Sequence, residues 1–127
     1  MQTLFPEIKP YARHRLQVDA RHNLYIDESG SATGLPVVFL HGGPGSGCEF
    51  DSRRFFDPAV YRIILVDQRG SGRSTPQGET EDNTLQNLIA DLEQIRELLA
   101  VPAWVAFGGG WGSTLALAYA EHYPERV

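Results

Sequence analysis

Three short apolar runs, each followed by a glycine-rich or polar loop, constrain the fold of this chain more than any other feature. They cover residues 37–40, 61–66 and 103–107, and each consists largely of consecutive apolar residues. Runs of this kind are typical of parallel strands that are buried on both faces of a sheet. A helix is expected between the second and third runs, so the order of elements predicts an α/β fold with a parallel sheet.

The region ahead of the first run has a different pattern. Polar and apolar residues alternate at 15–19 and again at 23–27, and the residues between them are polar enough for a turn. This alternation predicts an antiparallel hairpin with one face buried. A short amphipathic segment is expected at 49–56, between the first and second apolar runs.

Two helices are expected in the second half of the chain. Leucine and isoleucine recur at helical spacing over Leu85–Leu99, where Asn83 or Thr84 can cap the start and Pro102 lies just beyond the end. A second, Ala- and Leu-rich helix is expected over Trp111–His122. The second helix directly follows the third apolar run, as the α/β alternation requires.

Composition narrows the class of protein. The chain has 127 residues, at most one domain, and 11 Lys and Arg against 16 Asp and Glu give a net charge of -5, which argues against nucleic acid as a partner. No apolar stretch is long enough to span a membrane, and the N-terminus lacks the pattern of a secretory signal. A lone Cys48 cannot form an internal disulfide. We therefore expect a cytoplasmic protein without a membrane partner.

The turn between the third run and the second helix carries the strongest functional signal. In a nucleophile elbow, Gly-x-Ser-x-Gly joins a strand to a helix and lifts the serine hydroxyl above the sheet. Here the five residues are Gly108-Gly109-Gly110-Trp111-Gly112, so the outer glycines Gly108 and Gly112 are present and glycine occupies the serine position. The helix that follows would place its positive dipole end near a developing oxyanion.

Two further loops follow apolar runs. His41-Gly42-Gly43-Pro44-Gly45 can direct a backbone N–H at a carbonyl oxygen, as one half of an oxyanion hole whose other donor follows the nucleophile. The loop Asp67–Ser74 is rich in charge, Gly and Ser, and we interpret it as structural, with an Asp67–Arg69 ion pair as one way to shape it.

Together, these motifs resemble the N-terminal part of the proline iminopeptidases, a branch of the α/β-hydrolase superfamily. The resemblance rests on His41–Gly45, on Asp67–Pro76 (DQRGSGRSTP) and on Gly108–Ala120 (GGGWGSTLALAYA), and it runs through essentially the whole chain. It implies an α/β-hydrolase fold with a mostly parallel central sheet and an N-terminal antiparallel hairpin. It also implies a cytoplasmic serine peptidase that releases N-terminal proline from peptides or proline amides without a metal or cofactor.

Individual site residues follow from the resemblance. Gly110 takes the position of the nucleophilic serine, and the N–H groups of Gly43 and Trp111 take those of the oxyanion donors. The residues that support these motifs are His41, Gly42, Pro44, Gly108 and Gly112. The resemblance places the triad Asp and His, and the helical cap, beyond Val127. Residues 1–127 are therefore expected to form the N-terminal part of one domain, with the cap and C-terminal part absent, and to be inactive as given.

Several alternative interpretations stay open at this level. A non-catalytic relative used for binding is the main one, because Gly110 lacks a nucleophile. Ser113 is interpreted as structural rather than as a substitute nucleophile, and so are His41 and Cys48, while His14, His22 and His122 are expected to be solvated. A dinucleotide-binding turn would need glycine at position 113, and a P-loop would need Gly-Lys-Ser/Thr, so neither is favoured.

Overall fold

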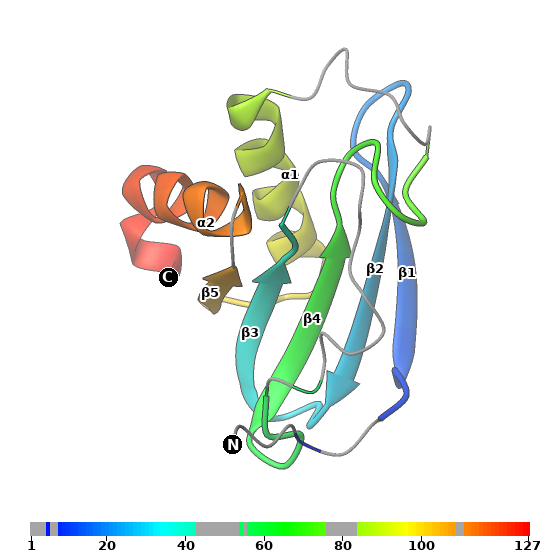
Figure 1. The fold of residues 1–127 in the computed structure, drawn as a ribbon, viewed down its shortest axis with the longest axis vertical. Helices are drawn as coiled ribbons and strands as arrows, with labels where there is room; N and C mark the ends of the chain where they lie inside the picture. Colours follow the sequence, from blue (N-terminus) through cyan, green and yellow to red (C-terminus); the bar gives the residue numbers. More distant parts are fainter. Residues whose placement is uncertain (1–4, 6–7, 43–53, 55, 76–83, 109–110) are drawn as a thin grey trace.

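A five-stranded mixed sheet forms the centre of the computed structural model, which describes residues 5, 8–42, 54, 56–75, 84–108 and 111–127. The elements are β1 (Ala12–Gln17), β2 (Asn23–Gly30), β3 (Leu35–Leu40), β4 (Tyr61–Asp67), α1 (Leu85–Leu98), β5 (Val105–Gly108), α2 (Trp111–His122) and the short 3-10 helix η2 (Pro124–Arg126). The strand order is β1-β2-β4-β3-β5 (Figure 1). β2 pairs antiparallel with β1 and β4, whereas β3 pairs parallel with β4 and β5. The predicted hairpin and parallel strands are confirmed.

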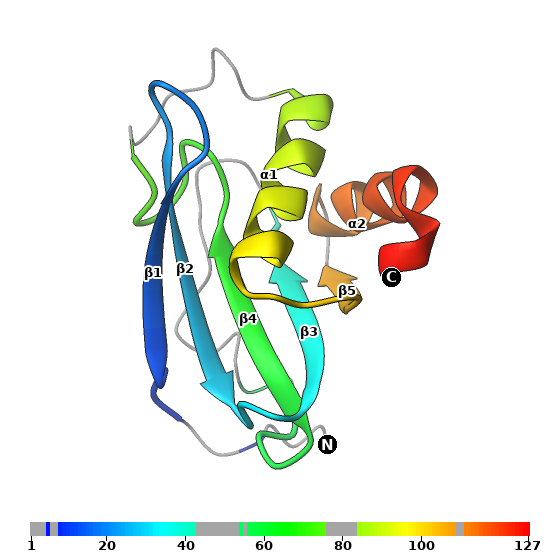
Figure 2. The ribbon, with the colours of Figure 1, turned by 180° about the vertical axis from the view of Figure 1, so that it is seen from behind.

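Both α-helices cover one face of the sheet, as the two opposite views show (Figures 1 and 2). Alternate residues of β3 and β4, such as Val38 and Ile64, belong to the core that packs against Leu92 of α1 and Leu115 of α2. The intervening residues form a smaller cluster on the opposite face with Phe56. This division explains why β3 and β4 are apolar at consecutive positions, because each face of the sheet takes every second side chain.

Helix α1 is capped by one of the two residues that the sequence offered. Thr84 has an extended backbone, and its hydroxyl accepts a hydrogen bond from the Asn87 N–H at 3.2 Å. The chain leaves the helix through Ala100, which has a φ of 56°. The apolar stripe of α1 faces the sheet, since Leu88, Leu92 and their neighbours on that side are buried. The predicted helix is therefore confirmed in position.

Several strand boundaries differ from those expected by a few residues, and distant contacts account for two of them. β1 begins at Ala12 rather than at 15, because β2 continues to Gly30 and Ala12 still has a partner in Glu28. β5 begins at Val105 rather than at 103, because the backbone N–H of Trp104 donates to the Arg126 carbonyl of η2 at 2.8 Å. In both cases a contact that is distant in sequence decides where the strand starts.

β5 lies at one edge of the sheet, and among the described residues its outer side pairs with no other strand. Val105 and Phe107 each retain 44% of their accessible surface. Apolar side chains are therefore exposed along this edge of the sheet. Separately, in the part of the chain that the structure describes, no helix is both long and apolar enough to cross a membrane.

Candidate active site

The ends of three parallel strands meet at one edge of the sheet. β3, β4 and β5 run in the same direction, and Leu40 is level with both Val66 and Gly108. The segments that follow these strands are those that the sequence singled out as motifs. Of the predicted site residues, His41, Gly42, Gly108, Trp111 and Gly112 are described, whereas Gly43, Pro44 and Gly110 lie outside the described residues.

The turn from β5 to α2 depends on close backbone approach. A Cβ on Gly112 would overlap the carbonyl oxygen of Leu40, and a Cβ on Gly108 would lie 2.5 Å from the carbonyl carbon of Gly112. Neither glycine has a positive φ, so both are needed for space rather than for an unusual conformation. The glycines allow the start of α2 to pack directly on the end of β3.

His41 is held by hydrogen bonds at both ring nitrogens. The side chain is buried, and its Nε2 lies 3.1 Å from the Gln68 backbone nitrogen, whose N–H can only donate. Nε2 is therefore the acceptor, so the proton of the neutral ring is on Nδ1, which lies 3.1 Å from the Gly42 carbonyl oxygen. Because the lone pair of Nε2 is already engaged by the Gln68 N–H, His41 is not placed to act as a base.

Gln68 joins the three motifs, and the sequence analysis did not single it out. Its side-chain Nε2 donates to the His41 carbonyl oxygen at 3.1 Å, and its Oε1 accepts from the Trp111 indole Nε1 at 3.2 Å. The signal available in the sequence was its position, because a polar residue two places after a buried parallel run lies at the carboxyl edge of the sheet, where ligands bind.

The loop after β4 is fixed by polar side chains and by two glycines with positive φ, Gly70 at 73° and Gly72 at 53°. A Cβ on Gly72 would lie 2.7 Å from Asp67 Oδ2. That oxygen accepts hydrogen bonds from the backbone N–H and Nε of Arg73, both at 3.0 Å. The Ser74 hydroxyl donates to the Asp67 carbonyl oxygen and accepts from the Tyr25 N–H. The structural role predicted for this loop agrees with these contacts.

The partner expected for Arg69 was wrong. Its guanidinium forms a bidentate pair with Asp91 of α1, at 2.6 and 2.9 Å, and lies 2.8 Å from Asp19 in the β1–β2 turn. Burial raises the pKa of the Asp91 carboxyl, and the hydrogen bonds and charge of Arg69 oppose that shift. Asp67, meanwhile, pairs with Arg73. Both partners of Arg69 therefore come from other elements, whereas Asp67 pairs within its own loop.

The prediction for His22 was also wrong, because only 1% of its surface is exposed and its Nδ1 lies 3.0 Å from Asp19 Oδ1. His14 is partly buried and lies 2.7 Å from Glu28, so it is less solvated than expected. His122 is exposed, with its Nδ1 3.1 Å from the Ala118 carbonyl oxygen. Cys48 lies outside the described residues.

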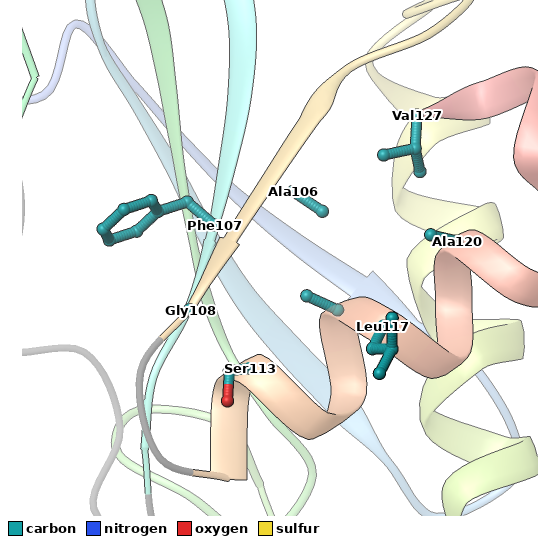
Figure 3. Close-up of a pocket in the computed structure, with 8 residues that line it drawn as sticks. Ala106, Phe107, Gly108, Ser113, Leu117, Ala120 and Val127 are labelled. Carbon is teal, nitrogen blue, oxygen red and sulfur yellow. The ribbon is translucent and has the colours of Figure 1, made fainter.

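An apolar groove of about 360 Å³ runs along α2 beside β5 (Figure 3). Its lining residues are Ala106, Phe107, Gly108, Ser113, Ala116, Leu117, Ala120 and Val127. Ser113 lies on the first turn of α2 and is exposed at the end of the groove nearest Gly108. The groove therefore begins beside the strand–helix turn and extends away from it along the open edge of the sheet.

The fold agrees with the comparison against known families. A family model described as alpha/beta hydrolase fold matches residues 36–127. The chain belongs to the α/β hydrolase fold family.

Comparison with individual sequences points to a narrower group of relatives. It is 60% identical to a proline iminopeptidase of Xanthomonas citri over 120 residues, which are 94% of this chain and 38% of that relative. It is 53% identical to a proline iminopeptidase of Arabidopsis thaliana over 126 residues, which are 99% of this chain and 33% of the relative. The resemblance predicted from the motifs is confirmed. The chain spans well under half the length of these curated relatives.

Solved structures share the fold. A proline iminopeptidase-related protein of Thermus thermophilus superposes with a TM-score of 0.79 at 25% identity, covering 93% of this chain and 42% of that one. A structure described as a putative epoxide hydrolase from Pseudomonas aeruginosa gives a TM-score of 0.75 at 23% identity, covering 100% of this chain and 41% of the other. The second likeness concerns the fold alone.

Proposed function

We propose that this chain forms the part of a proline iminopeptidase that supplies the nucleophile position and the oxyanion hole. The observation that carries the proposal is the glycine-packed turn from β5 to α2, where Gly108 and Gly112 allow the helix start to pack on the end of β3. Relatives that are 53–60% identical and named proline iminopeptidase support the substrate class, which is peptides or amides with N-terminal proline.

The chemistry of the proposed enzyme is acyl transfer. A serine hydroxyl at position 110 attacks the carbonyl carbon of the N-terminal proline and passes its proton to a histidine base. The carbonyl oxygen becomes an oxyanion, which the backbone N–H groups of Gly43 and Trp111 stabilise together with the N-terminal dipole of α2. The histidine then protonates the leaving amine, and water hydrolyses the acyl-enzyme. The resemblance implies no metal or cofactor in these steps, and a cytoplasmic location.

The chain as given is proposed to be inactive. Gly110 has no hydroxyl, and loss of the nucleophile alone costs a serine peptidase about a million-fold in kcat. The aspartate and histidine that the reaction requires are proposed to come from residues outside 1–127. His41 does not replace the missing base, because its Nε2 already accepts the Gln68 N–H.

A second candidate function is binding without catalysis, and Gly110 is the observation that favours it. A glycine at the nucleophile position lacks the whole serine side chain, including the reactive hydroxyl. Under this proposal the groove and strand ends would bind a ligand, and no histidine or aspartate partner would be required.

Four protein samples distinguish the catalytic function from binding without catalysis. The first pair is the 127-residue chain with Gly110 kept or with Gly110→Ser. The second pair is the same two sequences in an extended chain, in which residues 1–127 are followed by the residues that come after the aligned segment in the Xanthomonas citri relative. Hydrolysis of proline p-nitroanilide is followed by absorbance.

We expect turnover from the extended Gly110→Ser chain alone, because serine, histidine and aspartate act as a unit. Turnover by the 127-residue chain with Gly110 kept would show that position 110 is not the nucleophile. A folded but inactive extended Gly110→Ser chain would favour the binding protein.

A further inference from the structure

Gln68 lies between the two segments that carry the proposed oxyanion donors. On one side its Nε2 donates to the carbonyl oxygen of His41, which directly follows β3. On the other side its Oε1 accepts from the indole of Trp111, the first residue of α2. One side-chain amide therefore connects the end of β3 to the start of α2. Its N–H donates toward β3, and its oxygen accepts from α2.

We propose that Gln68 is a positioning residue that holds the end of β3 against the start of α2, the two segments that adjoin the proposed oxyanion donors, and this rests on the proposed function. The donors are backbone N–H groups and cannot adjust by changing a rotamer, so their separation depends on how the two segments are held. Gly108 and Gly112 permit the close packing of α2 on β3 but have no side chains that could hydrogen-bond across it. The Gln68 amide supplies such a connection.

Gln68 is itself buried and hydrogen-bonded through its backbone. Only 5% of the residue is exposed, and its backbone N–H donates to His41 Nε2 at 3.1 Å. The loop that follows is tied to β2 and to its own start through Ser74, and Arg73 binds back to Asp67. The Gln68 amide thus extends from a fixed backbone, which a positioning role requires.

The consequences for catalysis follow from the sensitivity of oxyanion stabilisation to geometry. Removing one donor of an oxyanion hole costs about 100- to 1000-fold in kcat, and a misplacement of about 1 Å costs on the order of 100-fold. Gln68 contacts the donor-bearing segments and not the reacting atoms. Its loss should therefore lower kcat while KM changes little, because the hole matters most when charge has developed on the substrate oxygen.

The test compares variants in the extended Gly110→Ser chain. Gln68→Leu removes both side-chain hydrogen bonds at similar volume, and Gln68→Glu keeps the acceptor for Trp111 while losing the donor to His41. The matched control is Gln86→Leu, an exposed glutamine on α1. We expect kcat to fall about 10- to 100-fold in Gln68→Leu, with KM within about twofold, and to be unchanged in Gln86→Leu.

A second measurement does not depend on activity. In the 127-residue chain, ¹⁵N NMR resolves the two indole N–H groups, of which Trp111 donates to Gln68 and Trp104 donates to the Tyr119 hydroxyl. Gln68→Leu should shift the Trp111 indole resonance and leave that of Trp104 in place. Gln68→Glu, which keeps the indole acceptor, should shift it less.

The outcomes are distinguishable. An extended Gly110→Ser chain that is inactive with Gln68 intact would defeat the proposed function, and an unmoved Trp111 resonance in Gln68→Leu would defeat the hydrogen bond itself. If the extended chain is active, and Gln68→Leu shifts the resonance but leaves kcat within twofold, the positioning role is overturned. A fall in kcat with KM preserved, together with the shifted resonance, supports it.

Discussion

The loop Asp67–Thr75 after β4 and the turn Gly108–Gly112 after β5 lie at the same edge of the sheet but are specified in opposite ways. The first is defined by side chains, since Asp67, Arg69 and Ser74 each bind a specific partner. The second is defined by missing side chains, because a Cβ on Gly108 or Gly112 would overlap backbone atoms. At these polar positions the first is therefore sensitive to deletion of atoms. The second, like Gly70 and Gly72 within the first, is sensitive to their addition.

This contrast has a direct consequence for substitution. In the loop after β4, a smaller residue leaves a buried donor, acceptor or charge without its partner. In the turn after β5, even alanine, which ordinarily favours a helix, forces two backbones apart. The following predictions test both sides of the contrast, beginning with the largest expected effect.

Removing Arg69 should be the most damaging change. Its side chain is 5% exposed and that of Asp91 is 4% exposed, so Arg69→Leu leaves the Asp91 carboxylate buried without its bidentate partner. Breaking such a pair from one side costs about 3–5 kcal/mol in the free energy of unfolding. Urea denaturation at pH 7 measures this loss in the free energy of unfolding.

The control for Arg69 is the double variant Arg69→Leu with Asp91→Leu, which removes both charges. It should recover most of the loss, since apolar replacement of a whole buried pair is often neutral. A loss below about 1 kcal/mol in the single variant would mean that the pair is better solvated than its burial indicates.

Gly112→Ala should destabilise the chain by about 1–3 kcal/mol, near the upper end, because its Cβ would overlap the Leu40 carbonyl oxygen. Helix propensity alone predicts the opposite sign, a gain of about 1 kcal/mol. Thr114→Ala, at an exposed position on the same helix, is the control and should be neutral or slightly stabilising. Thermal unfolding of both variants measures the sign of the change in stability. A more stable Gly112→Ala variant would contradict the contrast between the loop after β4 and the turn after β5.

Ser74→Ala should cost about 1–3 kcal/mol, because the buried Tyr25 N–H loses its acceptor. Ser29 offers a matched control, since it is equally buried and its hydroxyl has no hydrogen-bond partner among the described residues. Ser29→Ala should therefore be neutral or stabilising. Equal losses for the two serines in urea denaturation would show that burial rather than hydrogen bonding sets the cost.

The smallest effect concerns pH. Asp19 accepts backbone hydrogen bonds from Arg21 and His22 and lies beside Arg69, and these contacts lower the pKa of its carboxyl. A lowered carboxyl pKa contributes stability above the unfolded value of about 3.9, and that stability is lost as pH falls below it. Asp19→Asn should therefore reduce the decline in stability below about pH 4. An unchanged pH profile in acid denaturation would exclude this contribution.

The sequence predicted the elements of this fold better than its polar contacts. β3, β4 and α1 were predictable because their apolar patterns reflect burial in the sheet and the helix interface. The close packing at Gly112 was predictable because only glycine fits a strand–helix turn of that kind. The site positions Gly43, Pro44 and Gly110 remain predictions, since they lie outside the described residues.

The polar contacts were less predictable for a physical reason. Arg69 binds Asp91, 22 positions away on α1, and nothing local distinguishes that carboxylate from Asp67. The burial of His22 likewise depends on where the β1–β2 turn lies against Arg69. Pairing of charged side chains follows the tertiary arrangement, which periodicity does not encode.

The open edge of β5 has a consequence for the chain in solution. A strand at a sheet edge offers backbone donors and acceptors on its outer side, and Val105 and Phe107 of the edge strand β5 are each 44% exposed. Two copies that meet edge to edge can continue one sheet through both molecules, and a third copy can be recruited by the surrounding apolar surface. We therefore expect the purified 127-residue chain to sediment as a concentration-dependent mixture rather than as a monomer. Phe107→Lys should shift that mixture toward monomer, because a charged side chain at a strand edge discourages pairing.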